Sequence, residues 1–180
     1  MNYAQYDRHR LMPVELQSER LVLRGFQRDD FEDLCRLHAD ERVVRYLGQG
    51  GKPRSREETW RGLTSYVGQW LLLGYGLYAV TARNGKLLGR AGIYHPQHWP
   101  CPEIAYAFFP ECWGKNLATE TVALIRYAIP AGAFARLVSF IHPENNASAR
   151  VAQKNDAVLS GTHLLDGTEV NVWEYPLTMH

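Results

Sequence analysis

The sequence lacks the features that mark several large classes of protein. It has three cysteines in 180 residues, Cys35, Cys101 and Cys112, and no Cys-x-x-Cys pair. An odd number of isolated cysteines argues against a disulfide framework and a zinc site, and is typical of reduced thiols in the cytoplasm. His95 and His98 have no acidic partner at metal-ligand spacing. We therefore expect no bound metal.

Long apolar runs and an excess of charge of one sign are also missing. No stretch approaches the roughly 18 apolar residues of a membrane span, and the first residues have no apolar leader core. The net charge is +1, from 20 basic and 19 acidic residues. Such a balance gives no general attraction to nucleic acid or to an anionic membrane. We expect a soluble cytoplasmic protein that binds neither, and any anion it binds would need a local site.

The chain has no internal repeat and no low-complexity segment, and it lacks both GxxxxGK[ST] and GxGxxG. The two nucleotide-binding motifs are therefore excluded. A length of 180 residues suits one domain with a substantial core. We expect a polar lead-in over residues 1–15 and a single domain over residues 16–180.

The apolar periodicity predicts one mixed α/β (α+β) domain. Alternation of apolar residues predicts strands over 20–26, 76–83, 86–95, 102–109 and 136–142, and a closing hairpin over 157–177. Helical spacing predicts helices over 28–40, 55–73, 114–129 and 145–155. This order favours a mixed, mostly antiparallel sheet of six to seven strands, flanked by helices, with a strand–helix–strand crossover in its middle.

The loop inside that crossover is a candidate anion site. Strand 102–109 leads through Pro110 and Gly114 into a helix, whose first amides lack helical partners. If the helix starts near Gly114, these are the amides of Lys115, Asn116, Leu117 and Ala118. The amides, the helix dipole and the charge of Lys115 would attract an anion. Every strand–helix junction has such a helix start, so the segment alone favours an ordinary corner.

Glu103 is a candidate general base. It shares one face of its strand with Ala105 and Ala107, whose small side chains leave a trough beside the carboxylate. A glutamate partly buried there would have a raised pKa and could accept a proton from an amine near pH 7. Taken alone, the residue is better explained as a strand-end glutamate that is solvated or paired with an arginine.

Ser148 is a second candidate. Pro143 ends the preceding strand, and Asn145 or Asn146 can cap the helix that follows. Ser148 then falls in the first turn, where its hydroxyl would face the space between the two parallel strands. Plain capping of the helix explains the same residues and stays open.

Three segments in order resemble the GNAT superfamily of acyl-CoA-dependent N-acyltransferases, and its RimJ/RimL branch in particular. They are "LQSERLVLRGFQRDDFEDL", "EIAYAFFPECWGKNLATET" and "RLVSFIHPENNASARVAQK". The resemblance covers most of the chain. It implies an acetyl-CoA-dependent N-acetyltransferase that moves an acetyl group directly to a primary amine, either a protein N-terminus or a small molecule.

The resemblance also assigns roles to individual residues. The backbone of Ala107, Phe108 and Phe109 would hydrogen-bond the pantetheine arm of CoA, and Asn145 would contact the same arm. The turn that would hold the pyrophosphate comprises Trp113, Gly114, Lys115, Asn116, Leu117, Ala118 and Thr119. Glu103 would be the general base, directly or through water, and Ser148 would protonate the leaving thiolate.

Several positions depart from the family pattern. Glu111 replaces the usual Gln or Arg, Asn116 the usual Gly or Ala, and Ala105 a strand glycine, while "KNDAV" lacks the glycine and aromatic of Lys-x-Gly-Phe. A carboxylate and a side chain near the phosphates could weaken CoA binding, although Asn116 could instead add a donor. An acyl-CoA-binding or regulatory module with little or no turnover is therefore the alternative to an active enzyme.

The acceptor is the least defined part of the hypothesis. Residues that could line its site are Trp60, Trp70, Tyr75, Tyr78, His95, His98 and Trp99. The tryptophans of the predicted helix are better explained as core residues. The loop "YHPQHWPCP", residues 94–102, is expected to form either one wall of the acceptor site or a homodimer contact.

Overall fold

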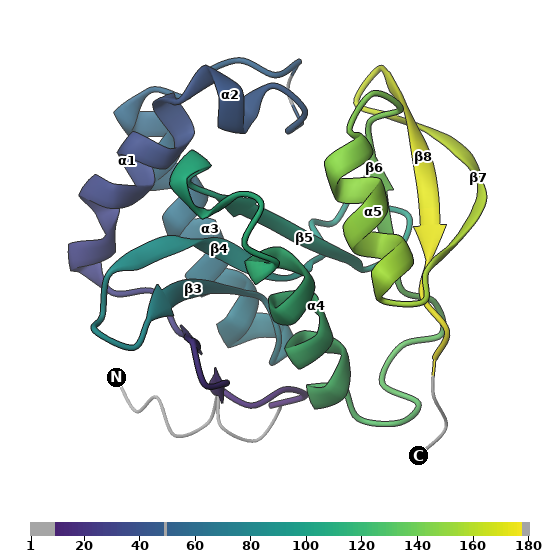
Figure 1. Ribbon diagram of the computed structural model, residues 1–180, viewed down its shortest axis with the longest axis horizontal. Coiled ribbons are helices and arrows are strands. Elements are labelled where there is room, and N and C mark those ends of the chain that lie inside the picture. The colour runs from purple at the N-terminus through teal and green to yellow at the C-terminus, as the bar shows by residue number, and fades with distance from the viewer. Residues whose placement is uncertain (1–9, 49, 178–180) are drawn as a thin grey trace.

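The computed structural model describes residues 10–48 and 50–177, which form one open sheet with helices on both faces (Figure 1). Its strands are β1 (Glu15–Gln17), β2 (Leu21–Arg24), β3 (Leu77–Ala82), β4 (Leu87–Tyr94), β5 (Glu103–Phe108), β6 (Val138–Ile141), β7 (Val158–Leu165) and β8 (Thr168–Glu174). The helices are η2 (Arg28–Asp30), α1 (Phe31–Ala39), α2 (Glu41–Val44), α3 (Arg56–Leu73), η3 (Pro110–Cys112), α4 (Leu117–Ala128) and α5 (Asn146–Lys154).

The described strands lie in the order β1-β2-β3-β4-β5-β6-β8-β7, and β5 and β6 are the parallel pair among them. The predicted α/β class and the crossover β5–α4–β6 are confirmed. The expected six to seven strands were too few, because the sheet has eight strands among the described residues. The added strand is β1, which pairs antiparallel with β2. At three residues it is too short to show an alternating pattern. Most of the expected lead-in, residues 1–9, lies outside the described residues.

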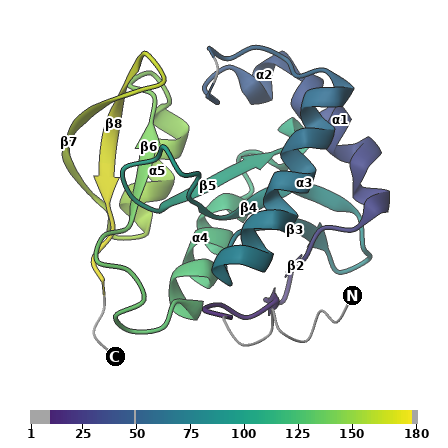
Figure 2. The ribbon, with the colours of Figure 1, turned by 180° about the vertical axis from the view of Figure 1, so that it is seen from behind.

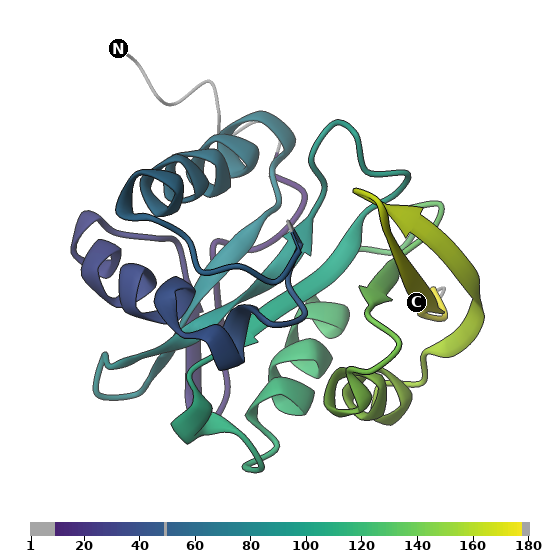
Figure 3. The same ribbon diagram turned by 90° about the horizontal axis from the view of Figure 1, so that it is seen from above.

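Two groups of helices cover opposite faces of the sheet, as seen from behind in Figure 2 and from above in Figure 3. The alternation along β5 explains this arrangement, because its side chains point to the two faces in turn. Ile104 and Phe108 join the core cluster that contains the buried residues of α4. Ala107 joins the smaller cluster with Leu34 of α1 and Leu63 of α3.

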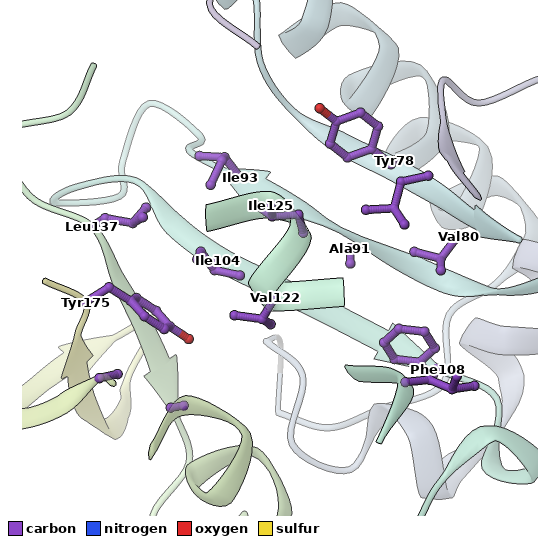
Figure 4. Close-up of a cluster of buried hydrophobic side chains, with 14 of the residues drawn as sticks. Tyr78, Val80, Ala91, Ile93, Ile104, Phe108, Val122, Ile125, Leu137 and Tyr175 are labelled. Carbon is purple, nitrogen blue, oxygen red and sulfur yellow. The ribbon is translucent and has the colours of Figure 1, made fainter. Parts of the chain in front are cut away.

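Helix α4 anchors the crossover to the sheet. Val122 and Ile125 are fully buried and lie against Ile104 of β5 in the core shown in Figure 4. Burying each of these side chains contributes roughly 1.5–3 kcal/mol to folding. The start of α4 is therefore held at the edge of the sheet where β5 ends.

The predicted capping box of the long helix is present in α3. The Ser55 hydroxyl accepts a hydrogen bond from the Glu58 amide (3.2 Å), and the Glu58 carboxylate accepts one from the Ser55 amide (2.7 Å). Gly74 ends the helix in the left-handed conformation. In the described part of the chain, no helix combines the length and the apolar character needed to cross a membrane.

Candidate active site

The parallel strands β5 and β6 separate soon after they meet. Their register contains a single pair, Glu103 with Val138, and the Ser139 hydroxyl closes this junction by donating to the Ile104 carbonyl oxygen (2.7 Å). From there β6 pairs with β8 along its full length, while β5 continues alongside β4. Figure 1 shows the two strands diverging above this point. The edge of β5 beyond Glu103 is thus left open.

A cavity of about 660 Å³ lies beside this open edge and the start of α4. Most residues assigned to the cofactor by resemblance line it: Ala107, Phe108, Trp113, Gly114, Asn116, Leu117, Ala118, Thr119 and Asn145. Two others do not. Phe109 packs between the two core clusters, and Lys115 is exposed, with its carbonyl oxygen accepting from Arg20 (3.2 Å). The structure thus places nine of the eleven assigned residues around one cavity and leaves Phe109 and Lys115 outside its lining.

Helix α4 starts later than predicted. It begins at Leu117 rather than near Gly114, because Gly114 and Asn116 both have a positive φ, 73° and 58°. Its first helical hydrogen bond runs from the Glu120 amide to the Asn116 carbonyl oxygen (3.0 Å). The amides at the start of the helix are therefore those of Leu117, Ala118 and Thr119. All three residues line the cavity.

The departures from the family pattern are accommodated by the fold. Glu111 is absent from the cavity lining and lies 3.8 Å from the Lys86 ammonium. The Asn116 side chain accepts a hydrogen bond from Lys154 (3.0 Å) rather than capping α4. Asp156, at the position of the family glycine, has a φ of 63°, and Ala157 is buried at the position of the aromatic. None of these side chains blocks the cavity.

Four cations that sequence reasoning did not identify surround this cavity. Arg42, Arg45, Arg150 and Lys154 all line it. Arg150 and Lys154 are four residues apart on α5 and therefore lie on the same side of that helix. The sequence shows this spacing, but whether that side of α5 faces the cavity depends on how the helix packs.

Glu103 lies in a second cavity, of about 380 Å³, on the other side of the opening. It is 8% exposed. Its Oε1 accepts from Trp99 Nε1 (2.9 Å), and its Oε2 accepts from the Phe140 amide (3.3 Å). Burial raises the pKa of Glu103 to about 7, although these two hydrogen bonds and the charge of Arg90 act in the opposite direction. The expected burial, raised pKa and trough with Ala105 are present.

The two cavities meet at Tyr106, Asn145 and Ser148, which line both. Asn145 caps α5 by accepting from the Ser148 amide (3.1 Å), and the Tyr106 hydroxyl donates to the Ser148 carbonyl oxygen (3.4 Å). No described residue hydrogen-bonds the Ser148 hydroxyl. That hydroxyl is thus available at the boundary between the cavities. Burial raises the pKa of Tyr106 well above its ordinary value, which keeps its phenol neutral.

The residues proposed for the acceptor side divide into two groups. His98 and Trp99 line the cavity that holds Glu103, so the loop 94–102 forms one of its walls. The other five lie elsewhere: Trp60, Trp70, Tyr75, Tyr78 and His95.

Each of these five side chains has a packing partner away from the cavity. The acceptor role is therefore wrong for Tyr75, Tyr78 and His95, whereas Trp70 packs against the core as expected for a tryptophan of that helix. Trp60 is 45% exposed and packs edge-on against Phe31. Trp70 packs against the buried Tyr78, and Tyr75 hydrogen-bonds His95 (2.9 Å). No group of three or more His, Cys, Asp or Glu side chains able to hold a metal occurs among the described residues.

Comparison with known proteins identifies the family. Residues 20–158 match the acetyltransferase (GNAT) domain. The uncharacterized protein YkkB of Bacillus subtilis (strain 168) is 31% identical over 173 residues, which cover 93% of this chain and 94% of YkkB. The crystal structure of the acetyltransferase from Agrobacterium tumefaciens str. C58 has a TM-score of 0.78 at 25% identity, covering 90% of this chain and 94% of that one.

A further solved structure shares the fold. RimL, a ribosomal L7/L12 alpha-N-protein acetyltransferase in complex with coenzyme A, has a TM-score of 0.74 at 21% identity and covers 91% of this chain and 96% of that chain. The match to the GNAT domain covers more than half of the sequence. It includes β5, α4 and β6, the elements beside which the two cavities lie. The chain therefore belongs to the GNAT acetyltransferase family and is an acyltransferase that uses acetyl-CoA.

Proposed function

We propose that this protein is an N-acetyltransferase of the RimJ/RimL-like branch that transfers an acetyl group from acetyl-CoA directly to a primary amine. The observation that carries this proposal is the position of Glu103. Its carboxyl group has a pKa of about 7 and lies in a cavity that meets the α4 cavity at Ser148. A base with that pKa is half ionised at neutral pH and is suited to accept a proton from an amine.

The open edge of β5 and the start of α4 would hold acetyl-CoA. The amides of Leu117, Ala118 and Thr119 offer donors to the pyrophosphate, and Arg150 and Lys154 add positive charge around the same cavity. The edge of β5 beyond Glu103 offers backbone groups to the pantetheine arm, with Asn145 beside it. This arrangement would place the thioester near the junction of the two cavities.

The transfer requires a proton to leave the amine and another to reach the sulfur. Glu103 accepts the proton of the amine as the nitrogen forms its bond to the acetyl carbon. The carbon–sulfur bond breaks, the Ser148 hydroxyl donates a proton to the thiolate, and the proton taken up by Glu103 returns to Ser148 through water, which restores both groups. Backbone amides at the open edge of β5 stabilise the oxyanion that develops on the acetyl oxygen. Glu103 lines the acceptor cavity and Ser148 lines both cavities, so both side chains face the connected space in which direct transfer would take place.

A binding module without turnover is the competing function. It was suggested by Glu111 and Asn116, which could have opposed the phosphates. Glu111 instead lies beside Lys86 outside the cavity lining, and Asn116 is bonded to Lys154. These contacts support binding of the cofactor. The position of Glu103 gives a further reason to favour catalysis over binding alone.

Two measurements on the purified protein test the proposal. Calorimetric titration with acetyl-CoA and with CoA should show saturable binding with a micromolar Kd. Release of CoA thiol in the presence of a panel of primary amines, including peptides with free N-termini, should then show turnover. Binding without turnover over the whole panel would support the module instead, and no binding at millimolar acetyl-CoA would contradict both functions.

A further inference from the structure

Arg90 is a buried cation at the acceptor cavity. It lies on β4, is 6% exposed and lines the cavity that contains Glu103. A guanidinium keeps its charge at any physiological pH, and burying it without an anionic partner is costly. The contacts of Arg90 therefore indicate whether its charge is balanced within the protein or is left for a ligand.

The contacts of Arg90 hold its side chain without neutralising it. Its Nε donates to Nε2 of His38 (3.2 Å), and its guanidinium lies over the ring of Tyr66, 5.5 Å from the centroid. His38 is fully buried, and burial together with the charges of Arg90 and Arg54 lowers its pKa to about 2. It is therefore a neutral acceptor. Among residues 10–48 and 50–177, none forms an ion pair with Arg90.

The two terminal nitrogens of Arg90 remain open to the cavity. No described residue hydrogen-bonds them, and neither is among the fully enclosed polar atoms that lack a partner. A planar guanidinium with Nε already anchored presents both Nη groups in a fixed orientation, which suits a carboxylate or a phosphate.

The sheet leaves space between this cation and Glu103. On β4, Arg90 pairs with Ala107 and Tyr94 pairs with Glu103. The side chains of Arg90 and Tyr94 therefore lie on the same face of the sheet as Glu103. The pair between them is Gly92 with Ala105. Gly92 must be glycine because a Cβ there would lie 2.2 Å from the Gly76 carbonyl oxygen. Ala105 lines the cavity and its partner Gly92 carries no side chain, so we take this Gly92–Ala105 pair as the floor between the guanidinium and the carboxylate.

Two further cations line the cavity, Arg54 and Arg45. Arg54 is placed by donating its amide to the His38 carbonyl oxygen (3.0 Å), and Arg45 lies 3.9 Å from the Glu144 carboxylate. Two carboxylates besides these cations line the cavity. Glu103 is half neutral near pH 7, and the exposed Asp166 lies 3.7 Å from the imidazole of His98.

We propose that the acceptor is a small primary amine that also carries an oxyanion group, a carboxylate or a phosphate, which Arg90 binds through its two free Nη groups with Arg54 beside it. The amine would lie at Glu103 and the anion at the far side of the Gly92–Ala105 floor. This inference rests on the proposed N-acetyltransferase function and names its substrate class. The same positive charge lowers the pKa of a bound ammonium group and eases its deprotonation.

The test measures binding separately from turnover. The protein saturated with CoA is titrated by calorimetry with glycine, β-alanine, 4-aminobutyrate and 5-aminovalerate, each against its carboxamide, and with O-phosphoethanolamine against ethanolamine. We expect at least one anionic amine to bind 10-fold or more tightly than its neutral counterpart. The length and type of that amine distinguish a carboxylate from a phosphate. Two results with the wild-type protein would overturn the inference. They are equal binding within every matched pair and no measurable binding of any anionic amine.

Substitution assigns the preference to Arg90. Arg90→Met should weaken the preferred anionic amine at least 10-fold and leave the CoA Kd within twofold, and Arg90→Lys should retain part of the affinity. Arg83→Met is the matched control, because Arg83 is exposed and bonds Gln17. Unchanged anion binding in Arg90→Met also overturns the inference.

A thiol-release assay on the same amines separates the two proposals. Turnover with neutral and anionic amines alike contradicts only the anionic acceptor. A preference in binding with no turnover on any amine contradicts the transferase function and leaves the anion site at Arg90 in place.

Discussion

The substitution Glu103→Gln tests the central assignment of the site through both catalysis and stability. Removal of a general base typically costs 10²–10⁴-fold in rate. We expect kcat to fall by at least about 100-fold while the Kd of acetyl-CoA stays within twofold, because Glu103 is absent from the lining of the cofactor cavity. In the wild type, the rate should rise with pH through an ionisation near pH 7, the pKa of this carboxyl group. That rise should be missing from the residual rate of the variant.

The same pKa gives a magnitude for stability. The carboxyl group has a pKa of about 7 in the folded chain against 4.5 for an unperturbed glutamate. Between these values the folded chain binds more protons than the unfolded chain, so stability falls as pH rises through this window. The difference of about 2.5 units corresponds to about 3 kcal/mol in full, and to about 2.5 kcal/mol between pH 5 and pH 8.

Chemical unfolding at pH 5 and pH 8 measures this term. Relative to the wild type, the free energy required to unfold Glu103→Gln should be about 2.5 kcal/mol larger at pH 8 than at pH 5, because only the wild type loses stability over this range. Comparing two pH values removes the fixed cost of placing an amide where Trp99 and Phe140 both donate. Glu169→Gln, at an exposed site on β8, is the matched control and should show no such change. A relative stability independent of pH would refute the buried, half-neutral carboxyl group, and unchanged kcat would refute its role as base.

Three further substitutions test neighbouring parts of the site. Trp99→Phe removes a hydrogen bond that lowers the pKa of Glu103, so the midpoint of the pH–rate profile should move up by roughly one unit, and a shift down would contradict this reasoning. Ser148→Ala should lower kcat at least about 10-fold with an unchanged KM for acetyl-CoA, whereas an unchanged kcat would show that another group protonates the thiolate. Glu111→Gln should change the CoA Kd less than twofold by calorimetry, because Glu111 lies beside Lys86 outside the cavity lining, and a large gain in affinity would show that it opposes the phosphates.

The sequence by itself determined the elements and much of the site. The period-two pattern of β5, the capping box at Ser55 and the cap at Asn145 all depend on residues close together in the chain, and the structure shows each of them. The trough beside Glu103 was also readable, because alternation along one strand fixes which side chains share a face. The catalytic roles of Glu103 and Ser148 stay predictions.

Local pattern was insufficient where one residue's conformation or a distant contact decided the outcome. Helix α4 starts at Leu117 because Asn116 adopts a left-handed conformation that its side-chain type permits but does not require. Residue type does not separate the aromatic residues expected at the acceptor side. Trp99 hydrogen-bonds Glu103, whereas Trp70 and Tyr78 pack together elsewhere. Which face each one occupies depends on the packing of α3 and the sheet.

Only the tertiary structure decided the charge of the acceptor cavity. The register of β4 with β5 puts Arg90 and Glu103 on one face of the sheet. Arg54, in the segment before α3, lines the same cavity because its amide bonds the His38 carbonyl oxygen. In the sequence, Arg90 is an ordinary strand arginine. Its burial, its contact with a neutral His38 and its open Nη groups result from folding. Short-range preferences fix helices and strands, whereas the energy of a buried charge depends on neighbours that are distant in the chain.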